Sequence, residues 1–166
     1  MTIETAVAQI MTREVVSVTP ETPVNEVARL LWQHKLTGVP VLEGRRVVGV
    51  VTEYDLIARQ AEWDAPLYVV FLDAFLRVPG SGDEEQLRRI LATTAGQLMS
   101  SPAITLRPED SVQDAATLMY ERRVNPVPVV DEAGDLVGIV SRSDIVRLMV
   151  TEESAYAAEE SDSPPA

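Results

Sequence analysis

Apolar positions alternate along this chain between short β-branched runs and stretches with the period of a helix. Residues 15–18, 39–42 and 47–51 are β-rich runs that end at proline, glycine or polar residues, which is typical of strands. Between the first two runs, apolar side chains from residue 24 to residue 31 recur at three- and four-residue spacing, which predicts a helix with one buried face. A second apolar helix is expected after residue 52. The predicted order is therefore β-α-β-β-α.

The same order of elements occurs a second time. The stretch that begins at residue 9 aligns with the stretch that begins at residue 97 at an offset of 88, which becomes 89 after one inserted residue near Ala133. The matched landmarks are Pro20-Glu21 with Pro108-Glu109, Val39-Pro40-Val41 with Val127-Pro128-Val129, Val48-Gly49 with Val137-Gly138, and Asp55 with Asp144. We assign the repeats to residues 1–60 and 95–151. One unit of about 50 residues buries too little surface to be stable alone, so the two are expected to pack together.

Polar residues mark the expected ends of the first helix in each repeat. Thr22 is expected to cap the helix of the first repeat, with Pro23 at the first helical position. Asp110 is expected to cap its counterpart, with Gln113 three residues later as in a capping box. His34, the only histidine, is interpreted as a favourable residue at the carboxyl end of the first helix.

Two segments lie outside the repeats. Residues 61–94 are expected to form a helical insert, with an apolar helix over 66–76, a break at 79–83 and an amphipathic helix over 84–91. Its aromatic side chains either cover the flank of the module or form a dimer surface. Residues 152–166 are rich in Ala, Glu, Ser and Pro, which predicts a disordered acidic tail.

The composition of the chain disfavours nucleic acid as a partner and insertion into a membrane. A net charge of -12 repels the phosphate backbone of nucleic acid, so nucleic acid is not an expected partner. No run of about 18 apolar residues is present, so we expect no membrane insertion. The first residues show neither a signal peptide nor a transit peptide, which favours the cytoplasm.

Catalytic and metal-binding residue types are scarce. The chain has no cysteine, which excludes disulfides, thiolate nucleophiles and Cys-ligated zinc. General acid–base or nucleophilic catalysis usually needs His, Cys or an activated pair in a cleft, and the one His is accounted for as a cap. We therefore expect no catalytic residues, no metal site made of protein alone and no enzymatic activity.

Several features occur twice and in order: a proline-ended first strand, Gly38–Val41 and Pro126–Val129, the Val-Gly strands, and the tetrapeptides Thr52–Asp55 and Ser141–Asp144. In these features the chain resembles a pair of CBS domains, also called a Bateman module, across nearly all of residues 7–150. The resemblance implies an α/β (α+β) fold in which two β-α-β-β-α units pack by pseudo-twofold symmetry. It also implies clefts that bind AMP, ADP, ATP or related adenosyl ligands, and a homodimer of two modules.

The two tetrapeptides allow two interpretations. Thr-x-x-Asp and Ser-x-x-Asp at a helix start are capping boxes, in which side chains satisfy backbone N–H groups without any ligand. Alternatively, Asp55 or Asp144 accepts hydrogen bonds from ribose hydroxyls, as the resemblance implies, while Thr52 or Ser141 and the helix-start N–H groups receive phosphate. The two roles are compatible with each other.

The resemblance also implies roles for residues near the strands. Adenine is expected to lie against Val39 or Val127, with backbone hydrogen bonds near Thr37-Gly38 or Asn125-Pro126. Ser17 and Thr105, on the first strands, are expected to line the same clefts.

The two expected nucleotide sites differ in the charge of their side chains. Ser141, Arg142 and Ser143 offer two hydroxyls and a guanidinium, which suits phosphate and makes the Ser141–Asp144 site the better one for a nucleotide. Glu53 and Tyr54 in the other tetrapeptide disfavour a polyphosphate. Further candidate phosphate contacts, each weighed against an ordinary surface charge, are Lys35, Arg122-Arg123 and Arg45-Arg46. Magnesium is expected only with bound ATP.

The leading hypothesis is a non-catalytic regulatory module that binds an adenine nucleotide between its repeats and signals to a separate effector protein. Such control requires a ligand with different affinity for two states. The alternative is a dimerisation or scaffold protein that binds no ligand.

Overall fold

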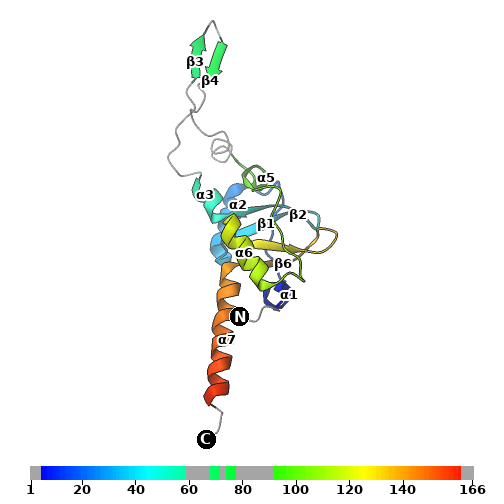
Figure 1. Ribbon diagram of the computed structural model, residues 1–166. Coiled ribbons are helices and arrows are strands. Elements are labelled where there is room, and N and C mark those ends of the chain that lie inside the picture. Colours follow the sequence, from blue (N-terminus) through cyan, green and yellow to red (C-terminus); the bar gives the residue numbers. More distant parts are fainter. Residues whose placement is uncertain (1–4, 59–67, 72–73, 78–91, 162–166) are drawn as a thin grey trace. The chain divides into compact units, whose positions relative to one another are not determined.

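The computed structural model describes residues 5–58, 68–71, 74–77 and 92–161 (Figure 1). Contacts divide the chain into two compact units. Unit 1 consists of Met1–Val16, Gly44–Val47 and Ala103–Ala166, and unit 2 consists of Ser17–Glu43 and Val48–Pro102. Each unit contains a pair of neighbouring strands and the helices that pack around them.

Unit 2 is built around the strands β1 (Gly38–Glu43) and β2 (Arg46–Thr52), of which the first two residues of β2 belong to unit 1. The helix α2 (Val24–His34) contacts β1, α3 (Glu53–Ala58) and α5 (Ala95–Leu98). The buried residues of α2 are Val24, Val27 and Leu31, which confirms the helix face predicted from their spacing.

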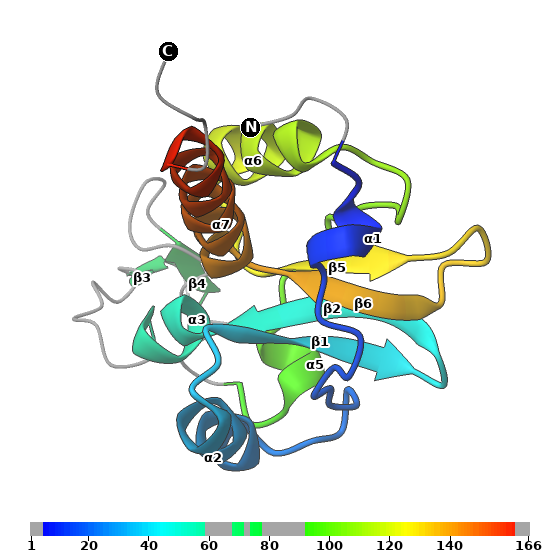
Figure 2. The same cartoon turned by 90° about the horizontal axis from the view of Figure 1, so that it is seen from below.

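Unit 1 repeats this plan. The strands β5 (Val127–Val130) and β6 (Leu136–Val140) pair antiparallel, with Val127 opposite Val140. The helices α6 (Val112–Arg122) and α7 (Arg142–Ser161) contact each other, and the short helix α1 (Val7–Ile10) contacts β6 and α7 (Figure 2). The core of unit 1 consists of Val7, Met11, Leu106, Ala115, Met119, Val127, Val129 and Val140.

The leading segment of each repeat belongs to the unit formed by the other repeat. In unit 1, Thr12 forms an antiparallel bridge with Ile139, with N–H···O distances of 2.9 Å in both directions. In unit 2, Ser100 forms the matching bridge with Val50, at 2.9 and 3.2 Å. The boundaries of the structural units therefore do not coincide with those of the sequence repeats, because the first residues of each repeat belong to the unit of the other.

A glycine and a methionine pack together beside each of these bridges. A Cβ atom added to Gly138 would lie 2.5 Å from Met11 Sδ, 2.9 Å from Met11 Cγ and 3.2 Å from the Thr12 carbonyl oxygen. In unit 2, Gly49 meets the side chain of Met99 in the same way. Gly138 lies in β6 and Gly49 lies in β2. The absence of a side chain at each glycine lets the methionine thioether lie directly on the strand backbone, because any larger residue would occupy the same space.

In each repeat the strand expected before the first helix forms only a single β-bridge. Val18 forms a parallel bridge with Val41 in unit 2, and Leu106 forms one with Val129 in unit 1. The prediction of a strand over residues 15–18, which the repeat extends to residues 103–106, is therefore wrong in extent. Only one residue of each run lies alongside its neighbour with strand geometry.

The expected helix caps are displaced by one residue. α6 is capped by Ser111, whose side chain forms a capping box with Asp114. Asp110 instead accepts a hydrogen bond from the Arg107 backbone N–H at 2.7 Å, and Thr22 Oγ1 accepts one from the Thr19 backbone N–H at 3.0 Å. The two predicted caps therefore stabilise the turn before each helix.

Each of these helices ends on a basic residue in the left-handed conformation. Lys35 after α2 has φ 53°, and Arg123 after α6 has φ 55°. A left-handed residue with a Cβ is strained, and glycine is the preferred residue at such a helix end. We expect Arg123→Gly to raise the free energy of unfolding by about 0.5–1 kcal/mol. Arg123→Ala keeps the Cβ and should give no such gain; equal denaturation midpoints for the two variants would contradict this explanation.

The structure corrects two predictions outside the repeats. Residues 66–76 were expected to be helical, but the described part forms the antiparallel strands β3 (Tyr68–Phe71) and β4 (Ala74–Arg77), with Tyr68 opposite Arg77. The run Tyr-Val-Val-Phe is aromatic and β-branched, which favours a strand. The helix predicted over 84–91 lies outside the described residues.

The predicted disorder from residue 152 is wrong as far as Ser161, because α7 continues to that residue. Residues 152–161 contain three alanines and four glutamates, which are strong helix formers that extend an established helix. Residues 162–166 lie outside the described part of the chain.

Candidate functional site

The tetrapeptide Ser141–Asp144 lies at the start of α7 in unit 1, where the aspartate carboxylate caps the serine N–H, and we call this arrangement the unit 1 box. Asp144 Oδ2 accepts hydrogen bonds from the Ser141 backbone N–H at 2.7 Å and from Ser141 Oγ at 2.8 Å. Ser141 Oγ also lies 2.7 Å from Ser143 Oγ. Asp144 is only 7% exposed, whereas Arg142 and Ser143 are exposed. The box thus holds a buried carboxylate beneath two exposed polar residues.

The matching tetrapeptide Thr52–Asp55 forms the same box at the start of α3 in unit 2. Asp55 Oδ2 accepts hydrogen bonds from the Thr52 backbone N–H and from Thr52 Oγ1, both at 2.8 Å, and Asp55 is 3% exposed. Glu53 and Tyr54 are exposed, so neither side chain fills the interior. The Asp55 N–H also donates to Thr52 Oγ1 at 3.4 Å, so both halves of the capping box are present in unit 2. In unit 1 the Asp144 carboxylate accepts from the Ser141 N–H, whereas the Asp144 N–H donates to the Ser141 carbonyl oxygen at 3.1 Å. The capping interpretation is therefore confirmed in full for Thr52–Asp55 and in its carboxylate half for Ser141–Asp144.

The first N–H of each of these helices also has an acceptor from the loop before the strand pair. The Arg142 N–H donates to Asn125 Oδ1 at 2.8 Å, and the Glu53 N–H donates to the Thr37 carbonyl oxygen at 3.0 Å. Asn125 and Thr37 occupy matched positions of the two repeats, at the offset of 88. The structure thus brings Asn125 to the Ser141 box and Thr37 to the Thr52 box.

Arg147 is a residue of the unit 1 box that the sequence analysis missed. Its NH2 group lies 2.7 Å from Asp144 Oδ1, and its side chain is 67% exposed. Asp144 therefore uses one carboxylate oxygen for the cap and the other for a solvent-exposed guanidinium. The three-residue spacing on an expected helix could have revealed this pair.

The remaining predicted site residues fall into two groups. Val39 and Val127 are both 0% exposed, so their side chains lie in the interiors of their units. Ser17 and Thr105 are exposed and directly precede the bridging residues Val18 and Leu106.

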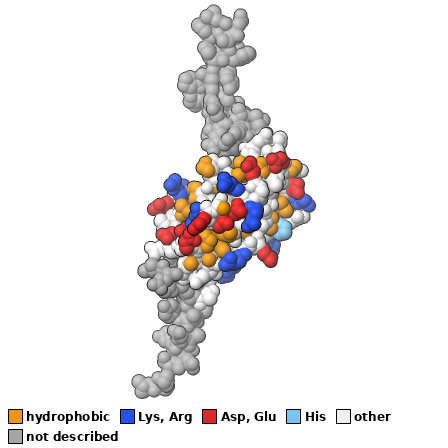
Figure 3. Space-filling view, turned by 90° about the vertical axis from the view of Figure 1, so that its right-hand side faces the viewer, with side chains coloured by type: hydrophobic (Ala, Val, Ile, Leu, Met, Phe, Trp, Pro, Cys, Tyr) orange, Lys and Arg blue, Asp and Glu red, His pale blue; other side chains and the backbone are white. Residues whose placement is uncertain are grey.

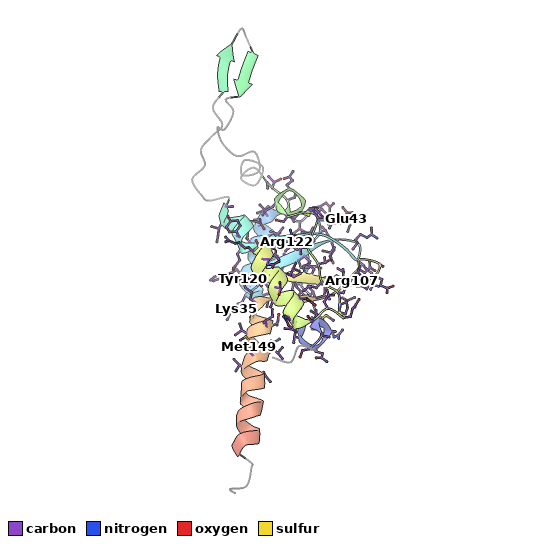
Figure 4. The ribbon with its side chains drawn as sticks, viewed as in Figure 1. Lys35, Glu43, Arg107, Tyr120, Arg122 and Met149 are labelled. Carbon is purple, nitrogen blue, oxygen red and sulfur yellow. The ribbon has the colours of Figure 1, made fainter. Side chains whose placement is uncertain are left out.

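The candidate phosphate contacts differ in their surroundings. Arg45 Nε lies 3.3 Å from Asp135 Oδ2, and Arg46 donates to the Ala133 carbonyl oxygen at 3.2 Å, so both contact the β5–β6 turn within unit 1. Lys35, Arg122 and Arg123 are exposed, and Figure 4 shows Arg122 on α6. Arg45 and Arg46 therefore contact this turn while both remain exposed.

The described surface carries mixed charges. On the face drawn in Figure 3, basic and acidic side chains are interspersed among hydrophobic ones. Within the described residues, no three His, Asp or Glu side chains are grouped as metal ligands would be. None of the described helices has the length and hydropathy that crossing a bilayer requires.

Comparisons with known proteins agree with this architecture. The family model of the CBS domain matches residues 7–62 and 95–151. CBS domain-containing protein YhcV of Bacillus subtilis is 28% identical over 153 residues, which cover 92% of this chain and 91% of that protein. The chloroplastic CBS domain-containing protein CBSX2 of Arabidopsis thaliana is 31% identical over 140 residues, which cover 78% of this chain and 56% of that protein.

A solved structure extends the comparison to three dimensions. The crystal structure of CBSX2 in complex with AMP is similar with a TM-score of 0.71 and 27% identity, covering 89% of this chain and 97% of that chain. The expected α+β fold is thereby confirmed, and so is the repeat inferred from the offset of 88. The chain belongs to the CBS domain family, and its two matched segments make it a tandem CBS pair.

Proposed function

We propose that this chain is a non-catalytic regulatory module that binds an adenine nucleotide at the Ser141–Asp144 box and signals to a separate effector protein. The observation that carries the proposal is the buried Asp144, held by Ser141 at the start of a long helix and lying beside an exposed arginine. A relative that covers most of this chain has been solved with AMP, which supports the ligand class.

The unit 1 box offers several groups suited to a nucleotide. A carboxylate is a pure acceptor and matches ribose hydroxyls, while hydroxyl and guanidinium groups match phosphate. Arg142, Ser143 and Arg147 supply these groups at the surface around Asp144. The unit 2 box carries the exposed Glu53 at the position of Arg142, so we propose that it binds a phosphorylated ligand more weakly or not at all.

A thermal-shift screen tests the ligand class. The purified chain is heated with AMP, ADP, ATP, S-adenosylmethionine or GTP, each with and without magnesium. A ligand that binds only the folded state stabilises it by about 2.7 kcal/mol at a hundredfold excess over its dissociation constant. We expect a shift with adenine nucleotides and none with GTP. A magnesium effect confined to ATP would support a metal ion held through the phosphates.

A scaffold that binds no ligand is the second candidate, and specific observations favour it as well. Large apolar side chains are exposed at matched positions of the two repeats: Trp32 is 85% exposed and Tyr120 is 86% exposed. Ile57 on α3 and Val146 on α7, also a matched pair, are 66% and 56% exposed. Exposed aromatic residues are typical interface anchors, so we propose a homodimer as part of either function.

The dimer is tested by removing the two aromatic anchors. Trp32→Ser combined with Tyr120→Ser should weaken self-association by about 2 kcal/mol, or roughly 30-fold in the dimer dissociation constant. Light scattering over a concentration series measures this constant. Ile104→Ser, at an apolar residue that is 36% exposed, is the control and should leave self-association unchanged. A double variant that dimerises like the unmodified chain would contradict the proposed surface.

A further inference from the structure

We propose that Arg147 makes the unit 1 box selective for phosphorylated ribonucleosides, by exchanging its ion pair with Asp144 for one with the ligand phosphate. This inference rests on the proposed function and goes further by naming the residue that decides which nucleosides bind.

Asp144 has little acceptor capacity left for a ribose. A carboxylate offers about four acceptor positions. Three are used within the protein: Ser141 N–H and Ser141 Oγ donate to Oδ2, and Arg147 donates to Oδ1. A ribose with two neighbouring hydroxyls needs two positions, so one of these donors has to leave.

Arg147 is the donor that leaves most easily. The Ser141 N–H is part of the backbone at the start of α7 and is fixed by the helix. The Arg147 side chain is 67% exposed, so its guanidinium can turn into water at small cost. A ribose hydroxyl is therefore expected to replace the Arg147 guanidinium as the donor to Asp144 Oδ1.

The displaced guanidinium then needs a new partner beside the ligand. A guanidinium presents five N–H donors in a planar fork that matches phosphate oxygens. A nucleoside monophosphate supplies that partner, whereas the unphosphorylated nucleoside breaks the ion pair and gives nothing in return. Specificity then arises partly from a penalty against the wrong ligand.

The two repeats differ at this position. At the offset of 89, Ala58 in the unit 2 box matches Arg147, and Glu53 matches Arg142. The box of unit 2 thus has the same cap without either arginine. Arg147→Ala gives the unit 1 box the residue that unit 2 already carries at this position on a helix, and the fold is expected to tolerate it.

Calorimetric titration of AMP and adenosine tests the inference. In Arg147→Ala, we expect the dissociation constant for AMP to rise about tenfold, because a charge-assisted hydrogen bond is lost. The constant for adenosine should fall about twofold, because a competing exposed ion pair is gone. The preference for AMP over adenosine should therefore fall roughly 20-fold.

Two further variants complete the experiment. Arg147→Gln keeps a hydrogen-bond donor without the charge and should also lose most of the preference, so the test does not depend on one variant. Arg29→Ala removes an equal charge from an exposed pair with Glu26 on α2 and should leave the preference unchanged. An unchanged preference in both Arg147 variants would overturn the inference while leaving the proposed function intact. An unmodified chain that binds neither ligand would overturn both.

Discussion

Gly138→Ala is expected to destabilise the chain by about 2 kcal/mol, because inserting a methyl group into a closely packed interior typically costs about 1–3 kcal/mol. The new Cβ would lie 2.5 Å from Met11 Sδ and 3.2 Å from the Thr12 carbonyl oxygen. The Met11 side chain would have to leave this space, while the Thr12 carbonyl, which belongs to the Thr12–Ile139 bridge, would have to give by only a few tenths of an ångström. Chemical denaturation measures the loss as a lower midpoint at an unchanged slope.

A double-mutant cycle identifies the cause of this loss. Met11→Ala alone opens a cavity, since Met11 is 8% exposed and part of the unit 1 core. Adding Gly138→Ala to that variant should cost clearly less than adding it to the unmodified chain, because the new methyl group then has room. Residues in direct contact typically show coupling of about 0.5–3 kcal/mol. Purely additive effects would show that the methionine is not the obstacle.

Asp144→Ala is expected to lower the free energy of unfolding by about 2 kcal/mol, which combines the loss of a helix cap with an unsatisfied buried donor. The carboxylate accepts from the Ser141 N–H, which is partly buried, and pairs with Arg147. Alanine leaves that N–H without its acceptor. Thermal or chemical denaturation measures the change.

Asp114→Ala is the matched control in the same unit. Asp114 also stands three residues after a serine cap, but its box is exposed: Ser111 Oγ donates to Asp114 Oδ2 at 2.6 Å on the surface of unit 1. Water can replace the lost hydrogen bonds there, so we expect a loss of only about 0.5–1 kcal/mol. If the two variants were equally destabilised, the burial of Asp144 would have no energetic consequence.

The sequence was sufficient to predict the parts of the fold that depend on local patterns. The strands around Val39, Val48, Val129 and Val137 and the helices with buried stripes form where the pattern predicts, because the same β-branched and spaced apolar residues form the cores. The hairpin β3–β4 was missed, because a short apolar run fits a strand and a buried helix equally well and periodicity cannot separate them.

Other features depend on contacts between distant residues. Nothing in the pattern near Met11 shows that its thioether lies on Gly138, since this follows from the leading segment joining the unit of the other repeat. The complete burial of Val127 depends on a core cluster that includes Ala115 and Met119 of α6, and the sequence pattern alone does not show this cluster. The sequence spacing suggests that Arg147 can pair with Asp144, but only the structure shows that this aspartate is buried.

The nucleotide site is tested most directly by calorimetric titration of the purified chain with AMP, repeated with Asp144→Ala and Asp114→Ala. We expect one AMP per chain, binding abolished or weakened at least about tenfold in Asp144→Ala, and unchanged binding in Asp114→Ala. A tenfold loss corresponds to about 1.4 kcal/mol of ribose contact. AMP binding of equal strength in all three proteins would contradict the assignment of the Ser141–Asp144 box as the nucleotide site.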